Sequence, residues 1–335
     1  MGLTAFPSGI SSMGVPVIPA GIPFGPDSKA WFVAPDSGSD GNRGDDIRRP
    51  LATLSKAHDL ARANKNDVVF MIAQSNSAAD TTDYQTATLT WSKDMVHLVG
   101  VHAGGMIGGR ARIATSTVSL SPLVNITADA CMFYGIHVFH GVTADQAGYI
   151  AVQVTGDRNV FKRCHFAGGG VSTVADDAAM RSLKLSGASE CYFEDCVIGL
   201  DTVTRSTTAN YELEFDNGSS ADGCARNIFR KCMFLTYGSG AHGMVIVDAD
   251  GIDRFAYFDD CMFVNPIQSG TTALNEVFSC TASTSPGGAV ILRNPLAYGC
   301  GPWEEDVETG RVVVLGHPTP ASTDGSGLAG APESP

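Results

Sequence analysis

Short segments in which apolar and polar residues alternate recur through the middle of this chain. Examples are Ile150/Val152/Val154, Leu183/Leu185 and Tyr211/Leu213/Phe215. Alternation with a period of two predicts half-buried β-strands, because successive side chains of a strand point to opposite faces. A polar turn, such as the one over 155–159, follows each segment. The pattern therefore predicts short strands separated by tight turns.

A six-residue unit follows each turn: an aromatic residue, two polar residues, cysteine, any residue and a large apolar residue. Its members are Phe161 with Cys164, Phe193 with Cys196, Phe229 with Cys232, Phe258 with Cys261, and a version at Phe133 that has Ile136 in place of cysteine. Equivalent positions recur every 28 to 36 residues, the spacing of a solenoid. Short strands and turns at this spacing predict a parallel β-helix whose coils pair about 4.8 Å apart.

The two polar residues inside the unit alternate in charge from one coil to the next. They are Lys162-Arg163, Glu194-Asp195, Arg230-Lys231 and Asp259-Asp260. Stacked coils would place opposite charges side by side, which fixes the register more than it adds stability. Cysteine is a small hydrophobe that suits the inward position beside them, so we expect this structural ladder to pack, in preference to forming disulfides or binding a metal.

Residues 29–75 have a different pattern. They predict a strand at Trp31-Phe32-Val33, a polar loop, and a helix from Pro50 to about Asn64. The apolar positions of this helix are Leu51, Leu54, Ala57, Leu60 and Ala61. A helix laid across the end of a solenoid covers its exposed strand edges, so we expect this one to be a cap.

Residues 1–28 predict an extended arm, because prolines interrupt a segment that carries no charge up to residue 26. The apolar residues of the arm are Phe6, Ile10, Val15, Val17, Ile18, Ile22 and Phe24. Such a segment needs a surface, either the flank of its own solenoid or a neighbouring subunit or shell protein, and we expect these residues to dock there. Residues 76–315 would form the β-helix, and residues 316–335 a flexible tail rich in Gly, Ser, Pro and Thr.

The N-terminal run carries a resemblance to a known family. Its parts are Trp31-Phe32-Val33, Gly38-Ser39-Asp40-Gly41-Asn42-Arg43-Gly44, Pro50-Leu51-Ala52-Thr53-Leu54-Ser55-Lys56-Ala57 and Asn66-Asp67-Val68-Val69. This run resembles the opening of pectate-lyase-like right-handed β-helices. With the downstream coils, the chain is similar to the head-decoration and tailspike-like proteins of tailed bacteriophages. The resemblance implies an all-β, right-handed parallel β-helix that commonly forms trimers on the virion exterior.

The composition narrows the function classes. With 22 Lys+Arg against 35 Asp+Glu, the net charge of −13 argues against nucleic-acid binding, which needs clustered cations. We see no apolar run long enough for a membrane span and no signal peptide, so we expect synthesis in a host cytoplasm. The nine cysteines include no C-x-x-C pair, and we expect them to be reduced and buried.

Glycan-cleaving β-helices use pairs of carboxylates, so paired acidic residues, and a histidine near a cation, are the candidates for catalysis. They are Asp176-Asp177, Asp259-Asp260, and His242 with Arg254. Together they resemble the polygalacturonase set of paired aspartates, a Gly-His-Gly and a basic residue, but Ala241 replaces the first glycine of that set. Asp259-Asp260 also suits the charge ladder better, so we expect no catalytic set here.

Two further groups have simpler interpretations. The loop with Asp36, Asp40, Asn42 and Asp45 could hold calcium, but its spacing favours a plain turn. His137 and His140 lie three apart in a strand, so one should be interior and the other exposed.

We therefore expect a non-enzymatic virion protein without cofactor or metal. It would be a trimeric capsid decoration protein that binds the major capsid protein and cements neighbouring capsomers, with no membrane or nucleic-acid partner. The alternative is a tailspike or fibre protein that binds or degrades host surface glycan.

Overall fold

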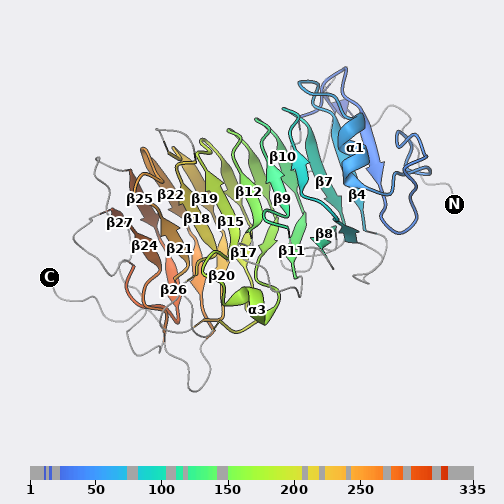
Figure 1. Ribbon diagram of the computed structural model, residues 1–335. Coiled ribbons are helices and arrows are strands. Elements are labelled where there is room, and N and C mark those ends of the chain that lie inside the picture. The colour runs from blue at the N-terminus through green and yellow to red at the C-terminus, as the bar shows by residue number, and fades with distance from the viewer. Residues whose placement is uncertain are drawn as a thin grey trace.

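The computed structural model describes residues 11–12, 15–16, 23–73, 82–102, 111–115, 120–141, 150–205, 210–218, 223–238, 243–266, 273–281, 288–303 and 311–315. These residues form an all-β, right-handed parallel solenoid with very little helix, which confirms the predicted fold. Figure 1 shows the coils stacked along one axis, with α1 at the N-terminal end and β27 at the other. Within the described residues, no helix is long and apolar enough to cross a membrane.

Three parallel sheets make the walls of the solenoid. The ten-stranded sheet contains, in spatial order, β3 (Ala30–Val33), β4 (Val68–Ile72), β7 (His97–Val101), β10 (Met132–Tyr134), β13 (Val160–Lys162), β16 (Tyr192–Glu194), β19 (Asn227–Arg230), β22 (Phe255–Asp259), β25 (Ala289–Arg293) and β27 (Val312–Leu315). The eight-stranded sheet contains β5 (Thr82–Tyr84), β8 (Arg112–Thr115), β11 (His137–His140), β14 (His165–Ala167), β17 (Val197–Gly199), β20 (Met233–Leu235), β23 (Met262–Val264) and β26 (Leu296–Tyr298). The seven-stranded sheet contains β6 (Leu89–Trp91), β9 (Val124–Ile126), β12 (Ile150–Val154), β15 (Arg181–Ser186), β18 (Leu213–Asp216), β21 (Val245–Val247) and β24 (Phe278–Cys280). Besides these, β1 (Ser11–Ser12) pairs antiparallel with β2 (Val15–Pro16), and a short helix, α3 (Ser172–Ala175), follows β14.

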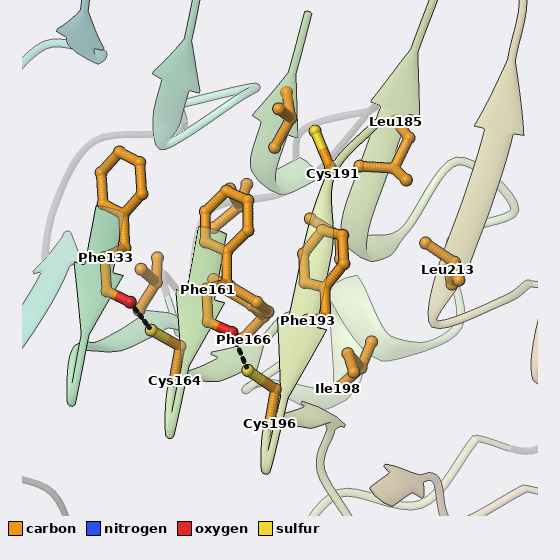
Figure 2. Close-up of a cluster of buried hydrophobic side chains, with 14 of the residues drawn as sticks. Phe133, Phe161, Cys164, Phe166, Leu185, Cys191, Phe193, Cys196, Ile198 and Leu213 are labelled. Atoms are coloured by element: carbon orange, nitrogen blue, oxygen red, sulfur yellow. Dashed lines mark hydrogen bonds between the residues drawn. The ribbon is translucent and has the colours of Figure 1, made fainter. Parts of the chain in front are cut away.

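The six-residue units lie in register on consecutive coils. The phenylalanine rings stack with their planes within 10° of parallel and their centroids between 4.5 and 5.0 Å apart, in the order Phe133, Phe161, Phe193, Phe229, Phe258. Figure 2 shows the first three rings of this column, Phe133, Phe161 and Phe193, with the thiols of Cys164 and Cys196 beside them. The thiols of Cys164 and Cys196 each lie 3.5 Å from the carbonyl oxygen of a phenylalanine one coil earlier, and all nine cysteines are free and buried. The phenylalanine rings and cysteine side chains therefore pack together in the core of the solenoid.

A residue in the left-handed conformation turns each coil from the ten-stranded to the eight-stranded sheet. Arg163, Asp195, Lys231 and Asp260 all have φ between 51° and 52° at this corner. The preceding position carries the alternating charges: Lys162 Nζ lies 2.9 Å from Glu194 Oε2, and Asp259 accepts ion pairs from Arg230 and Arg293. The register pairs Lys162, Glu194, Arg230, Asp259 and Arg293 in turn.

The capping helix is shorter than the sequence predicts. α1 spans Leu54–Leu60, because Thr53 is its N-cap and accepts a hydrogen bond from the backbone N–H of Lys56, while Leu51 still pairs with Val33 as a β-bridge. Leu54 and Ala57 are buried against the first coils.

Only part of the apolar arm can be placed. Phe24 packs on the outer face of the ten-stranded sheet, against the cluster of Val68, Val99 and Met132. Val15 lies in β2, and no other docking residue of the arm falls among the described residues. The described end of the arm therefore lies on the flank of its own solenoid.

Candidate functional site

The structure does not bring the sequence-predicted catalytic candidates together. Asp177 follows α3 and accepts a hydrogen bond from the backbone N–H of Ala179. Asp259 belongs to the charge ladder, and Arg254 pairs with its neighbour Asp253. His242 lies outside the described residues.

The calcium candidates are engaged within their own loop. Asp40 accepts hydrogen bonds from the backbone of Ala52 and Thr53, and Asn42 donates to the carbonyl of Pro50. Asp45 pairs with Arg43. The carboxylate of Asp40 thus fixes the residues that lead into α1.

The histidine prediction is wrong, because both side chains are buried. His140 is fully buried and hydrogen-bonded to the carbonyl of Leu120. His137 does point outward, but it accepts from Arg112 Nε at 3.2 Å and its ring stacks 4.6 Å from that of His165. Arg112 and His165 lie against the ring of His137, so this side chain is buried although it points outward.

A charged cluster lies instead on the outer face of the seven-stranded sheet. Its members are Arg181, Lys184, Glu214, Asp216 and Asp248, and we use "charged cluster" for these five residues. Lys184 of β15 and Glu214 of β18 are register partners on neighbouring strands. Asp216 and Asp248 occupy the next outward positions of their coils, immediately after the register partners Phe215 and Val247. Figure 1 shows β15, β18 and β21 side by side in the middle of the solenoid.

Glu214 sits between the two cations. Arg181 Nε donates to its Oε2 at 2.5 Å and Lys184 Nζ to its Oε1 at 2.6 Å. The side chain of Glu214 is only 10% exposed, so these contacts lie in a poorly hydrated environment where charge interactions are strong. Arg181 is fixed further by donating to the carbonyls of Ala178 and Met180.

The two aspartates have opposite environments. Burial raises the pKa of Asp216, but hydrogen bonds from Lys184 Nζ, 2.9 Å away, and from the backbone N–H of Gly218 outweigh it and hold that pKa below its ordinary value. Burial, together with the negative charges of Glu214 and Asp216, raises the pKa of Asp248. Neighbouring carboxylates with pKa values displaced in opposite directions suit one base and one acid.

A second, fully buried ion pair supports the cluster from the corner of the coil. Arg205 pairs with Glu212, which also accepts from Ser182 Oγ at 2.6 Å. Ser182 is the second residue of β15, and Glu212 immediately precedes β18. Breaking such a pair leaves a buried charge without compensation, so it fixes both strands.

The charged residues of this site are not adjacent in the sequence, but they do follow a pattern along the chain. Lys184, Glu214, Asp216 and Asp248 all alternate with the inward residues of consecutive strands. Only the stacking of coils, about 30 residues apart in the chain, makes them neighbours.

Comparisons with known proteins give the fold a context. No family model and no curated protein matches the sequence. Among solved structures, a pectin methylesterase D178A mutant in complex with a hexasaccharide matches with a TM-score of 0.55 and 14% identity, over 88% of this chain and 91% of that chain. A second pectin methylesterase–hexasaccharide complex matches with a TM-score of 0.53 and 15% identity, over the same shares of both chains. Pectate lyase Pel9A has a TM-score of 0.39, with 16% identity, over 83% of this chain and 70% of that chain.

These matches correct the expectation of a non-enzymatic protein. That expectation came from the lack of a complete catalytic set in the sequence, whereas the two solved structures of similar fold with TM-scores above 0.5 are pectin methylesterases. The part of the resemblance that concerns the architecture is confirmed: the chain is a right-handed parallel β-helix.

Proposed function

We propose that this chain binds an extended glycan along the outer face of the seven-stranded sheet and hydrolyses it at the charged cluster. The observation that carries the proposal is the row of outward carboxylates on register-paired strands, in which Lys184 Nζ contacts both Glu214 and Asp216 and Asp248 follows on the next coil. The pKa values of Asp216 and Asp248, which are displaced in opposite directions, agree with one base and one acid. That two solved structures with this fold hold hexasaccharides supports a saccharide ligand.

The two aspartates divide the chemistry of hydrolysis between them. Asp248, whose pKa is raised, is the better proton donor of the two, and it would protonate the glycosidic oxygen as the bond to that oxygen breaks. Asp216 stays ionised and accepts a proton from the water that attacks the sugar carbon. Arg181 and Lys184 neutralise Glu214 and keep the carboxylates from repelling one another strongly.

The test is cleavage of a panel of bacterial surface and plant polysaccharides, measured as new reducing ends. Asp216→Asn and Asp248→Asn should each reduce the rate by on the order of 10² or more, since each removes a proton-transfer group while keeping the shape. Asp177→Asn serves as the matched control, because Asp177 only caps the turn after α3. Activity unchanged in both cluster variants would reject the proposal.

A second candidate, hydrolysis of esters on a glycan, is favoured by the match to pectin methylesterases. The same carboxylate pair would serve, with the ester carbonyl in place of the sugar carbon. Release of methanol or acetate without new reducing ends would select it.

The virion setting remains a proposal of its own. A glycan-cleaving β-helix would suit a phage spike, and the apolar arm would be its attachment to the particle or to a trimer partner. Imaging of a particle that carries this chain would test where it sits and in how many copies.

A further inference from the structure

A pocket of about 330 Å³ lies at the N-terminal end of the solenoid, apart from the charged cluster. Ser55, His58 and Asp59 of α1 form one side, and the stretch from Asp83 of β5 to Thr90 of β6 forms the other. Its volume is in the range of small-ligand sites. α1 packs beside β6, the first strand of the seven-stranded sheet.

The lining of this pocket has the chemistry of a sugar site. Hydroxyl groups come from Thr86, Thr88 and Thr90. A hydroxyl can both donate and accept, but that of Thr88 already donates to the carbonyl oxygen of Pro122 at 2.8 Å and offers a ligand only its acceptor. The ring of Tyr84 is 48% exposed and offers a flat apolar surface with a polar tip.

The charges around the pocket exclude an acidic ligand. Asp59 and Asp83 line it, and among the residues that the structure describes no Lys or Arg does. Burial lowers the pKa of His58 to about 4, so this ring is neutral near pH 7, and its Nε2 already accepts from the backbone N–H of Ser92. Asp83 is fixed by a hydrogen bond from the backbone N–H of Leu54 at 2.8 Å. An uncharged, hydroxyl-rich ligand fits these groups, because carboxylates accept from hydroxyls and repel anions.

A row of outward side chains connects the pocket to the charged cluster. Thr90 is the register partner of Asn125, Asn125 of Gln153, and Gln153 of Lys184. These are three strand steps, or about 14 Å. The row is uncharged until Lys184, and the buried carboxamide oxygen of Asn125 has no hydrogen-bond partner in the described part of the chain.

We propose that the pocket holds a neutral sugar residue at one end of a glycan that runs along Thr90, Asn125 and Gln153 to the charged cluster. The inference rests on the proposed function for the bond that is cleaved, but binding in the pocket does not require cleavage. Because α1 stands at the end of the row, the glycan stops there, and the pocket fixes the length of the fragment between its end and the cleaved bond.

The test measures binding with the full chain carrying Asp216→Asn, on an array of neutral, amino-sugar and uronate oligosaccharides. Neutral members should be retained, and Tyr84→Ala in the same background should weaken that retention by about threefold to tenfold, as expected for loss of one stacked ring. Ala87→Trp should abolish it by filling the pocket. Tyr298→Ala is the matched control, since this tyrosine is similarly exposed at the far end of the solenoid on β26.

The outcomes separate the pocket from the catalytic proposal. Retention only of uronates or amino sugars, retention that neither pocket variant reduces, or no retention of any member would overturn the inference. Retention sensitive to Tyr84→Ala without cleavage of any glycan by the wild-type chain would keep the pocket and reject the proposed hydrolysis. Thermal unfolding of each variant establishes that a loss of binding is not a loss of fold.

Discussion

Lys184 Nζ lies 2.9 Å from Asp216 Oδ2, across the gap between β15 and β18. This contact sets Asp216 apart from Asp248 one strand further on, where burial and the charges of Glu214 and Asp216 raise the pKa. A single ammonium group therefore makes the two neighbouring carboxylates chemically different.

Replacement of Lys184 by methionine should shift the pH dependence of hydrolysis. Without the ammonium group, the pKa of Asp216 rises, because burial is then offset only by the hydrogen bonds from Gly218 and Ser186. A base must be ionised to act, so the acid limb of kcat/KM should move to higher pH. Lys162→Met is the control, since Lys162 pairs with Glu194 on the ten-stranded sheet. An unmoved acid limb in Lys184→Met would contradict the role given to Asp216.

The ring column makes a large contribution to stability. Phe193 is fully buried between Phe161 at 4.6 Å and Phe229 at 4.5 Å, so Phe193→Ala leaves a cavity in a column that cannot collapse. We expect the free energy of unfolding in urea to fall by about 3 to 5 kcal/mol. Tyr192→Ala, at the adjacent half-buried outward position, should cost clearly less. Equal losses would show that the column packs loosely.

The charge ladder should resist a reversal of sign. Glu194 lies in register between Lys162 and Arg230, so Glu194→Lys places three cations on consecutive coils. We expect a loss of about 1 kcal/mol or somewhat more in low salt, and a smaller loss in about 1 M salt, where the Debye length is about 3 Å. Glu194→Gln, which removes the charge without reversing it, should cost less. A loss independent of salt would point to packing instead of charge.

The cysteines should be inert in the folded chain. Burial raises the pKa of Cys131, Cys191, Cys224 and Cys300 to about 12, so almost no thiolate is present at pH 8. A thiol reagent should modify none of the nine cysteines before unfolding and all of them in urea. Rapid modification of the native chain would show that the coils open.

Acid should destabilise the chain in a defined window. Burial lowers the pKa of His97 to about 4, whereas the unfolded side chain takes up its proton near pH 6.5. The unfolded state therefore binds more protons between these values, and stability should fall as the pH drops from about 6.5 to 4. The contribution of His97 is on the order of 3 kcal/mol at its full extent.

His97→Gln isolates this contribution in thermal unfolding followed against pH. Asp83, whose burial raises its pKa to about 6, acts in the opposite direction and is the same in both chains. The variant should lose less stability than the wild type over this window. The same dependence of stability on pH in both chains would contradict the prediction, because it would show that His97 takes up its proton over the same pH range in the folded and unfolded states.

Much of the architecture follows from the sequence alone. The alternation of apolar residues and the recurrence of the aromatic and cysteine positions determine strands, corners and coil length, because both are local patterns with a fixed period. The start of the capping helix does not follow from the sequence, since Leu51 fits the helical pattern but forms a β-bridge with Val33 instead. At Leu51 the tertiary β-bridge to Val33 outweighs the local preference of the sequence for a helix.

The candidate site was decided by the tertiary structure. Lys184, Glu214 and Asp248 are separated by about 30 residues in the chain, and only the register of β15, β18 and β21 brings them together. The same holds for the pocket, where α1 meets the stretch from Asp83 to Thr90. Periodicity in the sequence fixes which face of the sheet a residue points to. Which residues lie beside it on neighbouring strands, and whether other groups cover it, depends on how coils of unequal length stack.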